Sequence, residues 1–171
     1  IERGSDLGPV MNKKQFDNIL TAIDKEIANG AKILCGYPID ASHKKKGFYI
    51  KPTIISNIDN ASSFCQNEIF GPVASVHQVD SLQEALNIAN DSNFGLTAAI
   101  HTRDIDRAFW YAKNIRSGTV NINSGTYGSE PHMPFGGIGN SGNGTREPGT
   151  PALDVYSELK NISLLVSEEK I

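Results

Sequence analysis

Glycine is dense between residues 120 and 149, where a short apolar stretch leads into a long segment with no regular pattern. The glycines that deny this segment a continuous helix or strand are Gly125, Gly128, Gly136, Gly137, Gly139, Gly142, Gly144 and Gly149. Loops of such length in compact domains are usually functional or disordered. Tyr127, Met133 and Phe135 argue against disorder, because a disordered segment would leave their apolar side chains in water. The segment is therefore predicted to be a shaped, functional loop.

Residues 137–142 spell Gly-Ile-Gly-Asn-Ser-Gly, which matches the GxGxxG pattern of dinucleotide-binding loops. Such a loop needs a helix that opens at its end, because the amides of the helix N-terminus hold the pyrophosphate. The residues that follow include Gly144, Pro148 and Gly149 and cannot continue as a helix. The match is therefore interpreted as accidental.

Cys35 and Cys65 are the only cysteines and hence the only candidate thiol nucleophiles in the chain. A catalytic thiol needs a nearby cation or a helix N-terminus that stabilises the thiolate. Cys35 lies in an apolar strand pattern and Cys65 follows Ser62-Ser63-Phe64, so neither shows this signature. Both are expected to be buried, unreactive thiols in a reducing compartment, and their spacing does not indicate a metal site. No catalytic residue is assigned within the chain.

The composition is that of an ordinary globular protein, with 39% hydrophobic and 20% charged residues. A chain of 171 residues is long enough for one hydrophobic core, and one domain is expected. The net charge of -3 gives no electrostatic reason to expect binding to nucleic acid or to an anionic membrane. No apolar run approaches the roughly 18 residues that a membrane span requires, and no signal-peptide pattern is present. We expect a cytoplasmic protein, and the missing initial methionine indicates a fragment or a processed piece.

Three segments have the apolar periodicity of helices. Asn12 can cap the first of them, which is predicted to run to about Asn29. Ser81 begins the second with a capping box, and Asp104 can cap the third. On the third helix the residues expected to face inward are Ile105, Ala108, Phe109, Ala112 and Ile115.

Apolar and β-branched runs between these helices predict strands. The predicted strands cover residues 31–35, 48–55, 73–79, 96–102, 119–123 and 161–166. Pro52 is expected to place the second strand at an edge or a bend of the sheet. The alternation of strands and helices predicts an α/β fold, a largely parallel sheet with crossover helices. In such folds ligands usually bind beyond the carboxyl ends of the strands.

Short motifs follow one another along nearly the whole chain. They are Gly8-Pro9, Gly30-Ala31-Lys32, 47–53, 67–72, 93–98, 118–123, 134–137, Ser141-Gly142 and Arg146-Glu147. In this order they resemble the C-terminal third of the aldehyde dehydrogenase superfamily, that is, part of its catalytic domain. Each motif is weak by itself, whereas the ordered set is highly specific.

The resemblance implies an enzyme that oxidises an aldehyde to a carboxylic acid through a cysteine thioester and passes a hydride to NAD+ or NADP+. It implies that Glu68 binds the ribose hydroxyls next to nicotinamide and that Phe70 packs near the ring. Phe135 would line the aldehyde tunnel, which residues 124–133 would shape. Without the resemblance, the same three side chains would be interpreted as a solvated loop acid, a core aromatic and an ordinary anchoring aromatic.

The resemblance also divides the chain into a partial catalytic domain, residues 1–150, and a C-terminal oligomerisation segment, residues 151–171. In the family the nucleophilic cysteine, its glutamate base and the cofactor domain lie upstream, so the chain alone is expected to be inactive. One departure is that Gly139 and Asn140 follow Ile138, where the family commonly has a lysine.

Two interpretations follow from the resemblance. The first is a fragment of an NAD(P)-dependent aldehyde dehydrogenase, with a small-molecule aldehyde and further copies of the chain as partners. The second is a non-catalytic, truncated relative that acts as an assembly or binding module. The particular aldehyde, the choice between NAD+ and NADP+ and the number of subunits stay open at this point.

Overall fold

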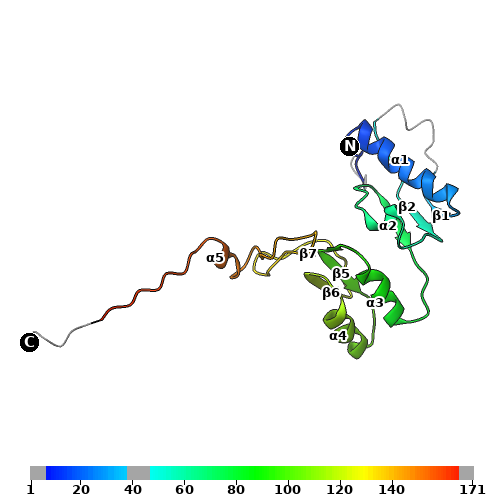
Figure 1. Ribbon diagram of the computed structural model, residues 1–171. Helices are drawn as coiled ribbons and strands as arrows, with labels where there is room; N and C mark the ends of the chain where they lie inside the picture. The colour runs from blue at the N-terminus through cyan, green and yellow to red at the C-terminus, as the bar shows by residue number, and fades with distance from the viewer. Residues whose placement is uncertain (1–6, 38–46, 166–171) are drawn as a thin grey trace, which may run out of the picture. The chain divides into compact units, whose positions relative to one another are not determined.

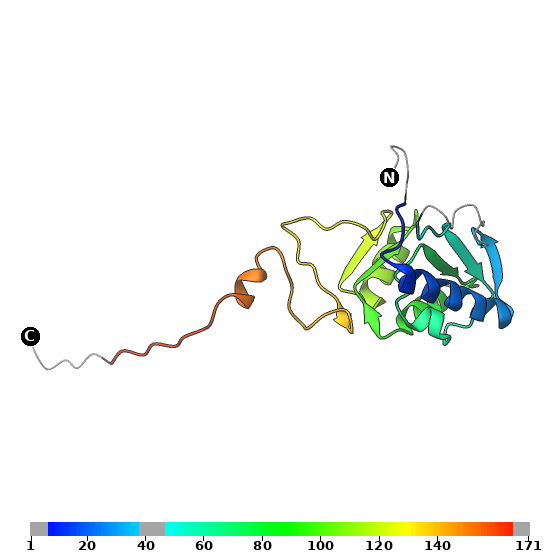
Figure 2. The same ribbon diagram turned by 90° about the horizontal axis from the view of Figure 1, so that it is seen from above.

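The computed structural model describes residues 7–37 and 47–165, which form two compact units, Ile1–Ser92 and Asn93–Ile171 (Figures 1 and 2). Each unit is described by itself. The first contains α1 (Lys13–Ala28), β1 (Lys32–Cys35), β2 (Thr53–Ser56), α2 (Ser63–Gln66), β3 (Val73–Val76) and α3 (Leu82–Asn90). The second contains β4 (Phe94–Gly95), β5 (Thr97–Ile100), α4 (Ile105–Asn114), β6 (Thr119–Ile122), β7 (Ile138–Gly139) and α5 (Ala152–Val155). No helix in the described ranges is long and apolar enough to cross a membrane.

The α1 helix begins and ends where the sequence predicts. The Asn12 side chain accepts a hydrogen bond from the backbone N–H of Gln15 at 2.9 Å, which caps the helix. Gly30 follows the C-terminal cap and has a φ of 97°, a left-handed conformation that glycine adopts at little cost. A cap of this kind contributes only about 1 kcal/mol, so burial of the apolar face must hold the helix in place.

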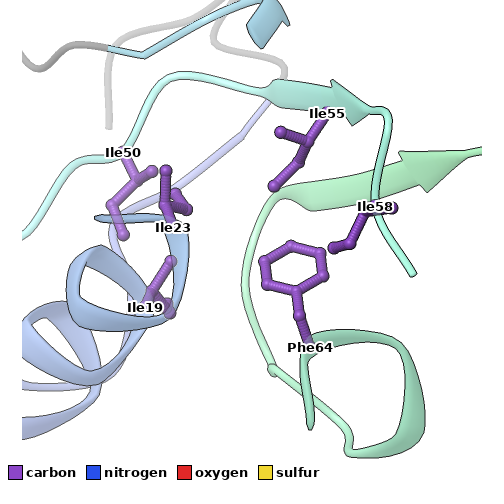
Figure 3. Packing of buried hydrophobic residues seen from close by; sticks show 6 residues of the cluster. All are labelled: Ile19, Ile23, Ile50, Ile55, Ile58 and Phe64. Carbon is purple, nitrogen blue, oxygen red and sulfur yellow. The ribbon is translucent and has the colours of Figure 1, made fainter. Parts of the chain in front are cut away.

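Ile19 and Ile23 of α1 are completely buried. They lie in the core of the first unit, which Figure 3 shows from close by. The other buried members of this core are Ile50, Ile55, Ile58 and Phe64. Each large apolar side chain that leaves water stabilises the fold by roughly 1.5–3 kcal/mol. Burial of Ile19 and Ile23, which belong to the apolar stripe of α1, therefore fixes this helix on the core.

The sheet of the first unit has the order β1-β2-β3. The pairing of β1 with β2 is antiparallel, whereas that of β2 with β3 is parallel, with Thr53 opposite Val73. The sequence left an edge or a bend open for this strand, and since β2 is central in the sheet, the edge position is wrong. The strand starts immediately after Pro52, so the missing N–H of proline removes no hydrogen bond from the ladder.

In the second unit, β5 pairs with β6 in parallel, and α4 is the crossover between them (Figure 1). The short strands β4 and β7 pair antiparallel. Asp104 caps α4 as predicted, since its Oδ1 accepts from the N–H groups of Asp106 at 3.0 Å and Arg107 at 3.1 Å. The α/β class is as predicted, although the described sheets are mixed, with two parallel and two antiparallel pairings.

The buried face of α4 agrees only in part with the predicted one. Ala108 is buried as predicted, and Tyr111 is buried as well, whereas Ile105 and Phe109 are 62% and 65% exposed. The apolar residues of this helix cover a wide arc, so their periodicity fits more than one orientation. Packing against β5 selects the side that carries Ala108 and Tyr111.

The last described residues, 156–165, contain no strand, although a strand was predicted over 161–166. Residue 166 lies outside the described part of the chain. Leu159, Ile162, Leu164 and Leu165 are at least 80% exposed. A strand forms only where a neighbouring strand satisfies its backbone groups, and the described chain supplies none here.

Gly71 lies against Ile19, and the space between them is too small for another carbon atom. A Cβ at residue 71 would lie 2.5 Å from Cδ1 and 3.0 Å from Cγ1 of Ile19. We predict that Gly71→Ala lowers the free energy of unfolding by about 1–3 kcal/mol, the usual cost of overpacking a core. Urea denaturation of the chain would measure this change.

A double-mutant cycle provides the control. Ile19→Val removes the Cδ1 methyl, and by itself it is expected to cost about 0.5–1.5 kcal/mol. The double variant should lose less stability than the sum of the two single variants, because valine makes room for the new methyl. Strict additivity of the two losses would contradict the contact.

Candidate functional site

The segment Glu68 to Pro72 is held between α1 and β2. The side-chain amide of Gln15 donates to the carbonyl groups of Ile69 at 2.6 Å and Phe70 at 3.2 Å. The N–H of Thr53 donates to the carbonyl of Pro72 at 2.9 Å. Together with the tight contact between Gly71 and α1, these bonds fix the backbone of the segment.

Phe70 has a φ of 51°, in the left-handed region that bulky residues rarely occupy. Such a conformation costs about 1–3 kcal/mol and persists only where the surroundings impose it. The Phe70 side chain is 76% exposed, and Glu68 is exposed as well. The alternative interpretation of Phe70 as a core residue is therefore wrong. The structure presents a carboxylate and an aromatic ring to solvent from one fixed segment.

Asn123 joins the carboxyl ends of β5 and β6, where the glycine-rich loop begins. Its Oδ1 accepts from the N–H of Thr102 at 2.8 Å, and its Nδ2 donates to the carbonyl of the same residue at 2.9 Å. The N–H of Asn123 donates to the carbonyl of Ile100 at 2.8 Å. Asn123 has a φ of 56°, which turns the chain out of the sheet and into the loop.

The loop packs backbone against backbone around Phe135. A Cβ on Gly118 would lie 1.7 Å from the carbonyl oxygen of Gly136, and a Cβ on Gly142 would lie 2.3 Å from that of Gly137. No side chain fits at such separations. The dense glycines therefore let strand β6 and the two arms of the loop approach one another, which agrees with the predicted shaped loop.

Phe135 is further fixed by residues near the end of the loop. Its N–H donates to the carbonyl of Glu147 at 3.2 Å, and the N–H of Glu147 donates back at 2.9 Å. The pKa of Tyr156 is raised, first by a hydrogen bond to the Glu147 side chain and then by the negative charge of that group. These contacts connect Phe135 to the residues that follow α5.

A cavity of about 640 Å³ lies beside β6 and is open to solvent. The apolar part of its wall consists of Val120, Met133, Pro134 and Phe135. The polar part includes Asn121, Ser124, Ser129 and Glu130. A mainly apolar wall with a few polar groups, at this size, is typical of small-molecule sites. Residues 124–133 were expected to shape the tunnel that Phe135 lines, and several of them do line the same cavity as Phe135.

Asn121 occupies the β6 position opposite Ala99 of β5 and also lines this cavity. Its Nδ2 is buried and has no hydrogen-bond partner among the described residues. A buried donor without a partner costs about 1–3 kcal/mol. No sequence pattern singled out this residue, because its position inside a strand gave no sign of the missing partner.

The GxGxxG match is not a phosphate cradle, as predicted. Ile138 and Gly139 form strand β7, which pairs with β4. No helix begins at Gly142, and the next helix starts only at Ala152. Without helical amides at its end, the motif lacks the anion site that the fingerprint requires.

Both cysteines are free thiols. Cys35 is exposed, so its expected burial is wrong; it is the last residue of β1 and lies beyond a register shift in the pairing with β2. Cys65 is half-buried, with its Sγ 3.7 Å from the Oγ of Ser75 and 3.8 Å from the Nε2 of His77. The proximity of Cys65 and His77 could not be predicted from the sequence, since only the packing of α2 on β3 brings them together.

The predicted site residues fall into two groups. Glu68 and Phe70 lie together in the first unit, and Phe135 lies in the second. The sequence gave no indication that Gln15 positions the first group, because the two lie more than fifty residues apart along the chain. For Asn123 the sequence did give an indication of its role at the start of the loop, because the residue stands at the end of a predicted strand.

Comparison with known proteins agrees with this geometry. A sequence profile of the aldehyde dehydrogenase family matches residues 1–162. A protein of Staphylococcus saprophyticus named putative aldehyde dehydrogenase is 42% identical over 162 residues, which is 95% of this chain and 34% of the relative. The alpha-ketoglutaric semialdehyde dehydrogenase of Bacillus subtilis is 40% identical over 157 residues, 91% of this chain and 32% of the relative. The chain thus spans about a third of the length of the curated relatives it matches.

Solved structures of the same family superpose on the chain. An aldehyde dehydrogenase of Mycobacterium tuberculosis complexed with NAD+ gives a TM-score of 0.87 at 34% identity, covering 99% of this chain and 34% of that protein. Betaine aldehyde dehydrogenase of Staphylococcus aureus in complex with NAD+ gives a TM-score of 0.83 at 34% identity, covering 91% of this chain and 31% of that protein. The chain with the exposed Glu68–Phe70 segment and the Phe135 cavity therefore belongs to the aldehyde dehydrogenase family.

Proposed function

We propose that this chain is part of an NAD(P)-dependent aldehyde dehydrogenase that oxidises an aldehyde to a carboxylic acid. The observation that carries the proposal is the exposed, backbone-fixed pair of Glu68 and Phe70 in a chain of this family. An exposed aromatic ring on a strained backbone has no role in the core of its own unit. Its conformation is instead suited to contact with a bound group.

The residues of this segment fit a nicotinamide nucleotide. The Glu68 carboxylate offers only acceptor oxygens, which suit the two hydroxyls of a ribose and repel a phosphate. The Phe70 ring, two residues away and exposed, would pack beside the nicotinamide. When bound, the nicotinamide supplies the hydride acceptor of the reaction. Two similar structures contain NAD+, which supports this cofactor class.

The aldehyde would enter beside Phe135. The cavity next to this residue has the volume of a small-molecule site and a largely apolar wall. Apolar walls limit the access of water to the reacting carbon until hydrolysis is due. The similar proteins are named for aldehydes as different as alpha-ketoglutaric semialdehyde and betaine aldehyde. Loop residues 124–133, which line this cavity together with Phe135, are the part that would select the aldehyde.

The thioester nucleophile would lie outside these 171 residues. Neither Cys35 nor Cys65 lines the Phe135 cavity. The glutamate base and the cofactor domain would also be supplied by the remainder of the dehydrogenase, so these residues alone are expected to show no turnover. Nothing in the comparisons favours the non-catalytic alternative.

The residues after α5 would assemble the subunits. The apolar side chains of residues 159–165 are exposed, and their backbone forms no strand within the described chain. Pairing with a sheet edge of a second copy would bury these side chains and satisfy the backbone groups. We place the assembled enzyme in the cytoplasm, consistent with two free thiols.

Substitution of Glu68 tests the function directly. The complete dehydrogenase should form reduced nicotinamide nucleotide, followed by its absorbance, when it is given an aldehyde. Glu68→Gln should slow hydride transfer about 10- to 100-fold, because hydrogen bonds to a charged acceptor contribute roughly 1.5–3 kcal/mol. Asp80→Asn, which neutralises an exposed acid elsewhere in the same unit, serves as the control. Equal kinetics for Glu68→Gln and wild type would remove Glu68 from the cofactor site.

Substitution of Phe135 tests the aldehyde site. Phe135→Ala should change the ratio of kcat/KM between a bulky and a short aldehyde by about tenfold, since one pocket contact discriminates by roughly 1–3 kcal/mol. The matched control is Phe109→Ala, which truncates an exposed phenylalanine of the same unit outside the cavity. An identical substrate profile for Phe135→Ala and wild type would exclude this residue from the tunnel.

Ser163 offers a test of assembly. Ser163→Pro removes a backbone N–H from the proposed strand and should shift the sedimentation coefficient of the enzyme towards that of smaller species. Ser163→Ala keeps the N–H and should sediment as wild type does. If the proline variant keeps the wild-type assembly, the segment does not join the subunits by strand pairing.

A further inference from the structure

Cys65 and His77 come from different elements of the first unit and meet outside the proposed cofactor and aldehyde sites. Cys65 lies on α2, and His77 directly follows β3. Ser75 and His77 share one face of the strand, because alternate residues point the same way. The Sγ of Cys65 is 3.8 Å from the Nε2 of His77, within reach of a hydrogen bond that involves sulfur.

The backbone on both sides of this pair is fixed. The Ser62 side chain caps α2 by accepting from the N–H of Cys65 at 3.4 Å. Phe64, next to Cys65, is buried in the core. On the other side, β3 is paired with the central strand β2 up to Val76. The distance between the sulfur and the imidazole is therefore set by the fold.

The surroundings of the pair favour a small, uncharged reactant. Cys65 packs against the apolar core and is half-buried, so a small, uncharged reagent reaches its sulfur more easily than a bulky or charged one. His77 lines an open cavity of about 510 Å³, so the imidazole side of the pair is reached from solvent. A thiol beside a positioned base is the arrangement that generates a nucleophilic sulfur.

We infer that Cys65 and His77 form a nucleophilic pair that adds covalently to α,β-unsaturated aldehydes. With the ring proton on Nδ1, Nε2 of His77 takes the thiol proton while sulfur bonds to the β-carbon of the aldehyde. The electron pair of the carbon–carbon double bond moves to the α-carbon, which then receives the proton from Nε2. The product is a thioether; the step needs no oxidant and releases no leaving group. The inference does not depend on dehydrogenase activity.

The chain contains its own reference thiol, because Cys35 is exposed and, among the described residues, its sulfur has no hydrogen-bond partner other than the carbonyl of Pro52, at 4.0 Å. The full chain is treated with acrolein at neutral pH, and peptide mass spectrometry follows the adducts at Cys35 and Cys65. Cys65 should react about tenfold faster than Cys35 despite its lower exposure. This is below the roughly 100-fold that a well-aligned base contributes, since 3.8 Å is a long contact. Propanal, which lacks the double bond, should give no stable adduct at Cys65.

Substitutions then assign the effect to the imidazole. His77→Gln should abolish the advantage of Cys65 and leave the rate at Cys35 unchanged. Urea denaturation of the variant, compared with wild type, shows separately that the chain remains folded. Ser75→Ala, which removes the other polar neighbour of the sulfur, should retain the advantage. The inference is overturned if Cys65 reacts no faster than Cys35, or if His77→Gln leaves the ratio of the two rates unaltered.

Discussion

The close approach of α1 to the segment before β3 is the contact on which the first unit depends. Ile19 lies so close to Gly71 that a Cβ added there would force the isoleucine side chain to shift. One turn earlier on the helix, Gln15 binds the two carbonyl groups just before Gly71. Burial of the apolar stripe of α1 therefore does more than stabilise a core. It fixes the backbone that carries Glu68 and Phe70.

In the second unit, glycines fix the backbone that carries the candidate site, because residues without side chains let the backbone segments pack closely. Gly118, Gly136, Gly137 and Gly142 let three stretches of backbone touch, and Asn123 fixes the start of the loop with its side-chain amide. A loop with many glycines would otherwise lose much conformational entropy on ordering. Here the entropy is offset by direct backbone packing and by the paired hydrogen bonds between Phe135 and Glu147.

Both units thus present side chains from strained or closely packed backbone rather than from the middle of regular elements. Phe70 and Asn123 have positive φ values, and each is held by hydrogen bonds from elsewhere in its unit. Pre-organisation of this kind reduces the entropy lost when a ligand binds. Cys65 and His77 differ in this respect, because the regular elements α2 and β3 set the separation of their side chains.

Local features of the chain were readable from the sequence. Asn12, Ser81 and Asp104 cap helices because short polar side chains satisfy the first free amides, an interaction that spans only three residues. The ordered motifs identified the family, and with it the α/β class and the candidate residues Glu68, Phe70 and Phe135. Tertiary packing decided everything that depends on residues far apart in the chain. It made β2 central, turned Tyr111 of α4 inward, left Cys35 exposed, and brought Gln15 to Phe70 and His77 to Cys65. A periodic pattern states which side chains avoid water, whereas the partner that covers them is set by the close packing of the folded chain.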